Sequence, residues 1–123
     1  MQTKKFDLED RLVEYTCRMM DVVEALPATR SGNYIAAELI RSGYLPTISY
    51  GQAQHAASPK DFVQKMSIVL KELKECRTAL KVILKKEIIQ PAAQLDGVYK
   101  ETDELIAITA KSIVTSKKNN NLR

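Results

Sequence analysis

The strongest constraint on the fold is a regular repeat of apolar residues in the middle of the chain. Between residues 62 and 83, apolar side chains recur at alternating spacings of four and three. This spacing places them on one face of an α-helix, as in the seam of a helical bundle. The repeat comprises Phe62, Met66, Val69, Leu73, Cys76, Leu80 and Ile83. A single stripe of this length predicts that other helices cover it.

A second repeat of the same kind precedes it near the start of the chain. Asp7 is a predicted N-cap, and Pro27 ends this helix because the residue before a proline is disfavoured in the helical region. The repeat comprises Leu8, Leu12, Tyr15, Met19, Val22 and Leu26, and Val13, Met20 and Val23 are predicted to widen its apolar face. The sequence therefore predicts a first helix over about 8–26.

The segment between these two repeats is less regular. A helix is predicted from about Asn33 to Ala57, although Gly43, Pro46 and Gly51 lie inside it. An internal proline removes one backbone hydrogen bond and clashes with the preceding turn. We therefore expect a kink in this second helix between residues 42 and 46.

Two further signals complete the fold prediction. Ser58 followed by Pro59 is a favourable helix start, and an apolar repeat from Leu95 to Ile113 predicts a fourth helix. Short links between helices of similar length favour antiparallel neighbours. The prediction is an all-α, antiparallel up-down-up-down four-helix bundle over residues 6–116. The ends, residues 1–5 and the basic, asparagine-rich 117–123, are expected to be disordered tails.

Composition agrees with a single small helical domain. The 123 residues include only four glycines and four prolines, and 45% are hydrophobic. A chain of this size buries roughly two-thirds of its surface on folding, so it needs no disulfide or metal to be stable. Cys17 and Cys76 are therefore predicted to be reduced core residues. No window is apolar enough to cross a membrane and no secretion signal is present, so we expect a cytoplasmic protein.

The sequence lacks the motifs of common enzymes. His55 is the only histidine, and Gln52 stands three residues before it, so no Glu-x-x-His metal motif forms. No glycine-rich phosphate loop is present. A Ser/His/Asp triad would have to use His55 as its base. We therefore expect no catalytic residue, no metal, no cofactor and no small-molecule substrate.

The first and third predicted helices carry opposite net charges. The segment 60–86 carries eight basic and three acidic residues, whereas 7–26 carries two basic and six acidic ones. Basic residues recur every three or four positions along the third helix, so they line one side of it. The candidate nucleic-acid-binding residues are Lys71, Lys74, Arg77, Lys81, Lys85 and Lys86. One interpretation is a phosphate-binding stripe that contacts RNA or DNA through the backbone. The other is a solvated face that keeps the protein soluble, with the acidic helix as its local partner.

Several short motifs resemble those of a known family. They are Arg41-Ser42-Gly43, Ala53-Gln54-x-Ala56, Ser58-Pro59-Lys60-Asp61-Phe62, Ser67-Ile68, Leu70-Lys71-Glu72 and Asp103-Glu104-Leu105-Ile106. In order and spacing they are similar to the four-helix bundle protein family, also called the 23S ribosomal RNA intervening-sequence proteins. The resemblance runs from about Phe6 to Lys118. It implies a bacterial cytoplasmic bundle that assembles as a homo-oligomer, a ring of five. A related branch binds nucleic acid and reverse transcriptase, and no catalytic residue is established for the family.

The chain departs from the family pattern in its second helix. Family members often carry an asparagine, an arginine and a glutamate where this chain has Ser49, Gly51 and Gln52. A polar site or assembly geometry that depends on that arginine-glutamate pair would be lost here.

The kinked second helix supplies the candidate contacts with other protein molecules. The predicted oligomer or partner interface comprises Arg41, Tyr44, Leu45, Ile48, Tyr50 and Gln54. Ordinary bundle core is the competing interpretation of the apolar members. The sequence thus predicts a non-enzymatic, homo-oligomeric bundle whose basic surface binds structured RNA or other nucleic acid. The alternative is a protein-interaction scaffold with no nucleic-acid role.

Overall fold

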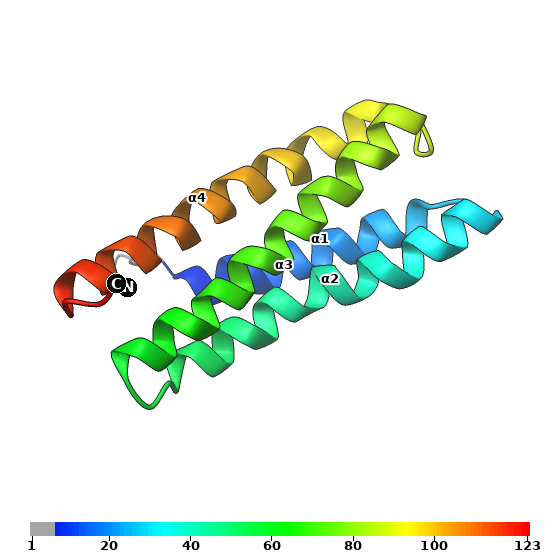
Figure 1. Cartoon of the computed structure of the whole chain (residues 1–123). Coiled ribbons are helices and arrows are strands. Elements are labelled where there is room, and N and C mark those ends of the chain that lie inside the picture. Colours follow the sequence, from blue (N-terminus) through cyan, green and yellow to red (C-terminus); the bar gives the residue numbers. More distant parts are fainter. Residues whose placement is uncertain (1–6) are drawn as a thin grey trace, which may run out of the picture.

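The structure of the chain is a computed structural model that describes residues 7–123. The helices are α1 (Leu8–Ala25), α2 (Arg30–Gln54), α3 (Pro59–Lys86) and α4 (Asp96–Asn119), with a short 3-10 turn, η1 (Ala92–Leu95), before α4. Figure 1 shows four long rods that alternate in direction, with no strand in the part of the chain described. The N-terminal tail predicted over 1–5 lies outside the described residues.

The helix contacts establish a four-cornered bundle. α1 packs against α2 and α4, and α3 packs against the same two helices. α1 and α3 therefore occupy diagonally opposite corners (Figure 1). This arrangement confirms the predicted all-α up-down-up-down four-helix bundle.

The core is built from the two repeats that the sequence displays most clearly. In α3, the six residues of the repeat from Met66 to Ile83 are fully buried, and Phe62 packs partly buried at the helix start. In α1, the repeat from Leu8 to Val22 is buried as well. The alternating spacing of four and three therefore identified the buried faces of both helices correctly.

The predicted widening of the apolar face of α1 is wrong for two of its three residues. Val13 is 46% exposed and Met20 is 40% exposed, whereas Val23 packs partly buried against the core. Cys17, predicted to lie in the core, is also exposed, and Cys76 is buried as expected. These exposed side chains are offset around α1 from its buried repeat, so the neighbouring helices α2 and α4 leave them in solvent.

Local chemistry fixes the helix ends. The side chains of Asp7 and Ser58 accept hydrogen bonds from the backbone N–H groups of Asp10 and Asp61, both at 3.1 Å, which confirms the two predicted caps. α2 begins at Arg30, three residues before the predicted start, because Thr29 caps it by accepting from the Gly32 N–H at 3.0 Å. Each cap satisfies a backbone donor that has no partner within its own helix.

The C-terminal end differs from the predicted disordered tail. α4 continues to Asn119, past residue 116. Asn121 then adopts the left-handed conformation, with φ of 54°, and the Leu122 N–H bonds the Lys117 carbonyl at 2.8 Å. This is the pattern of a Schellman cap, in which an asparagine can replace glycine. Leu122 also packs against the core, so the predicted tail over 117–123 is in large part ordered.

Pro46 lies inside α2 without ending it. A proline lacks the N–H that would bond the carbonyl four residues earlier, here that of Ser42. The thiol of Cys76 donates to this carbonyl from α3, with a sulfur–oxygen distance of 3.1 Å. α2 is therefore one continuous helix through Pro46, and the predicted kink stays a prediction.

Candidate nucleic-acid interface

The outward side of α3 carries exposed lysines. Lys74, Lys81 and Lys85 are separated by seven and four residues, which places them on one side of the helix, and Lys71 lies one turn before Lys74. All four side chains are exposed, and none forms an ion pair with another described residue. We call Lys71, Lys74, Lys81 and Lys85 the lysine face. Lys86 is also exposed and unpaired within residues 7–123, but it lies further round the helix.

Arg77 differs from the other candidate binding residues. Its Nη1 donates to Asp103 Oδ1 on α4 at 2.9 Å, and both side chains are partly exposed. Arg77 is therefore held between α3 and α4 rather than projecting with the lysines. The structure brings four of the six predicted residues onto one face, with Lys86 beside it and Arg77 tied to a carboxylate.

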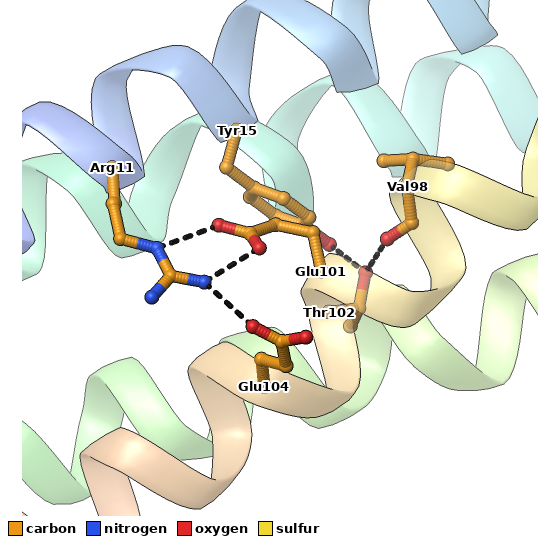
Figure 2. A network of polar contacts seen from close by, with 6 residues as sticks. All are labelled: Arg11, Tyr15, Val98, Glu101, Thr102 and Glu104. Atoms are coloured by element: carbon orange, nitrogen blue, oxygen red, sulfur yellow. Dashed lines mark hydrogen bonds and ion pairs between the residues drawn. The ribbon is translucent and has the colours of Figure 1, made fainter.

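The acidic helix is not the local partner of the lysine face. That helix is α1, and it lies diagonally across the bundle from α3. α1 forms ion pairs with α4 instead, where Arg11 contacts Glu101 and Glu104 (Figure 2). The interpretation in which α1 neutralises the lysines within one subunit is thus wrong.

Figure 2 shows how α1 and α4 are joined. Arg11 Nε and Nη2 donate to the two carboxylate oxygens of Glu101 at 2.9 and 2.6 Å, and Nη2 also reaches Glu104 at 3.1 Å. The hydrogen bond to Glu101 raises the pKa of the Arg11 guanidinium.

A buried hydrogen bond lies nearby between the same two helices. The Tyr15 hydroxyl and the Thr102 hydroxyl lie 2.8 Å apart, and Thr102 donates to the Val98 carbonyl at 2.7 Å. Tyr15 is therefore the donor of the pair, and burial raises its pKa, so it stays protonated. These groups bind the bundle together and are not free for a ligand.

A buried carboxyl group lies between α2 and α3. Ser49 Oγ donates to Glu72 Oε1 at 3.0 Å, and Glu72 is only 7% exposed. Burial raises the pKa of Glu72, and the hydrogen bond from Ser49 partly opposes that rise. Ser49 stands at the position where the resembling family often has asparagine, so this site keeps a polar contact. The burial of Glu72 was not predicted from the sequence, because it depends on how α2 and α3 face each other.

The predicted oligomer or partner residues lie on two sides of α2: Arg41, Tyr44, Leu45 and Ile48 share one side by their spacing, and Tyr50 and Gln54 share another. Tyr44 and Ile48 are exposed, and Leu45 and Tyr50 are partly buried. Gln54 Nε2 donates to the Tyr50 hydroxyl at 3.1 Å. Arg41 pairs with Glu38 at 3.2 Å and lines a groove next to α3.

A group of exposed apolar side chains lies where α1 packs against α2. The hydroxyls of Thr16 and Thr47 join the two helices at 2.7 Å. Residues three, four or seven positions from these threonines share their side of each helix. The exposed apolar residues among them are Val13, Met20, Ile40 and Tyr44, which we call the seam patch. The sequence placed Val13 and Met20 on the apolar face of their helix, because spacing alone does not show how far the neighbouring helices reach around it.

Neither a metal site nor a membrane-spanning helix is found among the described residues. No group of three or more histidine, cysteine, aspartate or glutamate side chains within 7–123 is placed to hold a metal ion. His55 is exposed at the end of α2. Over the same residues, every helix is too short or too polar to cross a bilayer.

Comparison with known proteins supports the fold. The structure is similar to the crystal structure of a protein of unknown function from the S23 ribosomal protein family of Bacteroides thetaiotaomicron. The TM-score is 0.80 at 22% sequence identity, and the match covers 87% of this chain and 98% of that one. No protein-family profile and no curated protein matches the sequence. The likeness therefore establishes a shared four-helix fold.

Proposed function

We propose that this protein is a non-enzymatic, homo-oligomeric bundle that binds structured RNA through the lysine face. The observation that carries the proposal is four exposed lysines on one side of α3 with no ion pair to any described residue. Lysine side chains bind nucleic-acid phosphates and release counterions when they do so. The contacts would be to the RNA backbone, with little selectivity for sequence.

Two further points support this function. The fold neighbour comes from a family named for a ribosomal protein, although that protein itself has no known function. The motif resemblance to the 23S ribosomal RNA intervening-sequence proteins leads in the same direction. We accordingly propose membership of that family, a bacterial origin and a cytoplasmic location.

Self-association is the second part of the proposal. One subunit has a formal net charge of only +4. The family resemblance implies a ring of five subunits. Such a ring would present several lysine faces to one RNA, so the assembly would bind RNA more tightly than one subunit does. The seam patch supplies the exposed apolar surface that such an interface needs.

The binding test is a titration of a structured RNA against the protein at several salt concentrations, followed by fluorescence anisotropy. Each phosphate contact contributes roughly −0.7 to −0.9 to the slope of log affinity against log salt. Replacing Lys71, Lys74, Lys81 and Lys85 by glutamine should weaken binding by about 100-fold at low salt and reduce the slope by about 3.

The matched control removes the same charge from another helix. Replacing Lys100, Lys111, Lys117 and Lys118 of α4 by glutamine should leave most of the affinity and the slope intact. Equal losses in the two quadruple variants would mean that net charge, and not the lysine face, governs binding. The absence of any binding at low salt would overturn the proposed function.

The seam patch also favours a second candidate function, a protein-interaction scaffold without a nucleic-acid role. Four apolar side chains around one interhelical contact form a surface suited to another protein. This candidate is favoured if the purified protein is monomeric and binds no RNA. Light scattering before and after nuclease treatment distinguishes the two, because it reports assembly and co-purified nucleic acid together.

A further inference from the structure

A groove beside the lysine face runs between α2 and α3. Its volume is about 790 Å³, within the range of roughly 300 to 1,000 Å³ typical of small-molecule sites. Lys71 and Lys74 line the groove and also belong to the lysine face. A chain of phosphates bound along α3 would therefore pass the mouth of the groove.

The groove combines positive charge with an apolar wall. Leu70 and Ala79 of α3 supply partly exposed aliphatic surface, whereas Leu39 of α2, which also borders the groove, is buried. Arg41 lies on the opposite rim from Lys71, and its charge is shared with Glu38 at 3.2 Å. The combination suits a ligand with an anionic end and a flat, weakly polar body.

A carboxylate and two hydroxyl groups add polar contacts to this wall. Glu75 is exposed and forms no ion pair with another residue of the described chain, so its oxygens can accept from an amino group. Carboxylates accept hydrogen bonds from base amino groups in this way. Ser67 and Thr78 donate to the carbonyls of Val63 and Lys74, which leaves their oxygens as acceptors. The groove thus offers acceptors to the edge of a nucleobase.

The lysine face alone cannot hold an unpaired base. It carries no aromatic side chain, and stacking on aromatic residues is the usual way in which proteins bind single-stranded bases. Specific recognition of RNA generally uses loops and bulges, whose bases can leave the helix. Aliphatic side chains in a groove provide the other surface on which such a base can pack.

We propose that this groove takes one unpaired nucleotide of the bound RNA. Its phosphate would lie on Lys71 and Lys74, and its base would lie against Leu70 and Ala79, with an amino group near Glu75. This inference rests on the proposed function, because the lysine face brings the RNA to the groove. It adds a preference for RNA with an unpaired nucleotide over continuous duplex.

The test compares two RNA hairpins that differ by a single bulged nucleotide, each titrated by fluorescence anisotropy. The wild-type chain should bind the bulged hairpin at least about 5-fold more tightly, because a base that enters the groove removes apolar surface from water. Ala79→Met, which fills the groove, should abolish this preference and leave the affinity for the paired hairpin unchanged. Thr78→Met is a second filling variant, at an exposed position, in case Ala79→Met disturbs the bundle.

Controls separate the groove from the lysine face. Ala107→Met places the same side chain at an exposed position of α4 and should keep the preference for the bulge. Equal affinity of the wild-type chain for both hairpins would overturn the groove inference and leave the lysine face intact. Equal weakening of both hairpins by the two filling variants would overturn it as well. If neither hairpin binds at low salt, the proposed function and this inference fail together.

Discussion

The lysine face of α3 and the seam patch between α1 and α2 make opposite use of the same helical pattern. α1 and α3 each bury a stripe with alternating spacings of four and three. Outside that stripe, α3 exposes unpaired lysines together with Ile68 and Val82, whereas α1 and α2 expose Val13, Met20, Ile40 and Tyr44 where the two helices meet. The buried stripe thus specifies the fold, and the side chains beside it form the surface that a partner would contact. One surface suits a polyanion, and the other suits another protein surface.

The sharpest way to test this contrast is to put charge into the seam patch. Ile40→Glu combined with Tyr44→Glu should weaken self-association by at least about 100-fold, because central apolar contacts often contribute 2 kcal/mol or more each. Sedimentation velocity over a range of protein concentrations measures the change. RNA affinity per subunit, measured on a short hairpin, should change far less.

The matched control places the same charges on other exposed apolar residues. Ile68 and Val82 of α3 are exposed to a similar degree, and their replacement by glutamate should leave the sedimentation profile unchanged. A wild-type chain that stays monomeric at high concentration, or a seam variant that assembles normally, would contradict the assignment.

Two glycines of α2 provide the next test, because Gly43 packs closely against α1 whereas Gly51 faces open space. A Cβ added at Gly43 would lie 2.8 Å from the Cβ of Met19, whereas one added at Gly51 meets nothing within 4 Å. Gly43→Ala should therefore lower the free energy of unfolding by about 1 to 3 kcal/mol through overpacking. Gly51→Ala should raise it by roughly 0.5 to 1 kcal/mol, because alanine is the better helix former.

Urea denaturation followed by circular dichroism measures both changes. A stabilising Gly43→Ala would show that α1 and α2 can move apart at no cost. The close packing inferred beneath the seam patch would then be wrong.

The sequence predicted features that depend on local chemistry and on helical period. The α3 repeat, the Asp7 and Ser58 caps and the exposed lysines all follow from residue type and spacing alone. The exposure of Val13 and Met20 was missed, because periodicity gives the angle of a side chain but not how far the neighbouring helices reach around it. Contacts such as Ser49–Glu72 depend on which helix faces which, and spacing within one helix carries no such information.

The buried carboxyl group of Glu72, where α3 packs against α2, should make the stability of the bundle depend on pH. Burial raises the pKa of Glu72 above its ordinary value of about 4.3. A raised carboxyl pKa means that the folded state binds the proton more tightly than the unfolded state does. The charged form therefore destabilises the fold above the folded pKa, and this cost disappears as the pH falls below the ordinary value.

Glu72→Gln should consequently stabilise the bundle at pH 7 to 8 and have progressively less effect toward pH 4. Ser49 can still donate to the amide oxygen of the glutamine, so the hydrogen bond is kept. The measurement is urea unfolding of both chains at several pH values, with Glu14→Gln on α1 as the exposed control. A stability difference that stays constant with pH would mean that the carboxyl group of Glu72 is not desolvated as its burial indicates.

The smallest expected effect concerns the edge of the lysine face, where Arg77 is paired with Asp103 at 2.9 Å. An exposed pair of this kind contributes roughly 0 to 1 kcal/mol, so the pair holds the arginine only loosely. Asp103→Asn should free Arg77 for phosphate and raise RNA affinity by about 2-fold, with a slightly steeper salt slope.

Arg77→Gln should cost less affinity than Lys81→Gln, because a paired arginine gives up its carboxylate contact before it binds phosphate. Equal losses from Arg77→Gln and Lys81→Gln would show that the pair opens freely. The binding surface would then extend past the four lysines toward α4, and the division between paired and unpaired cations on this face would no longer predict where RNA lies.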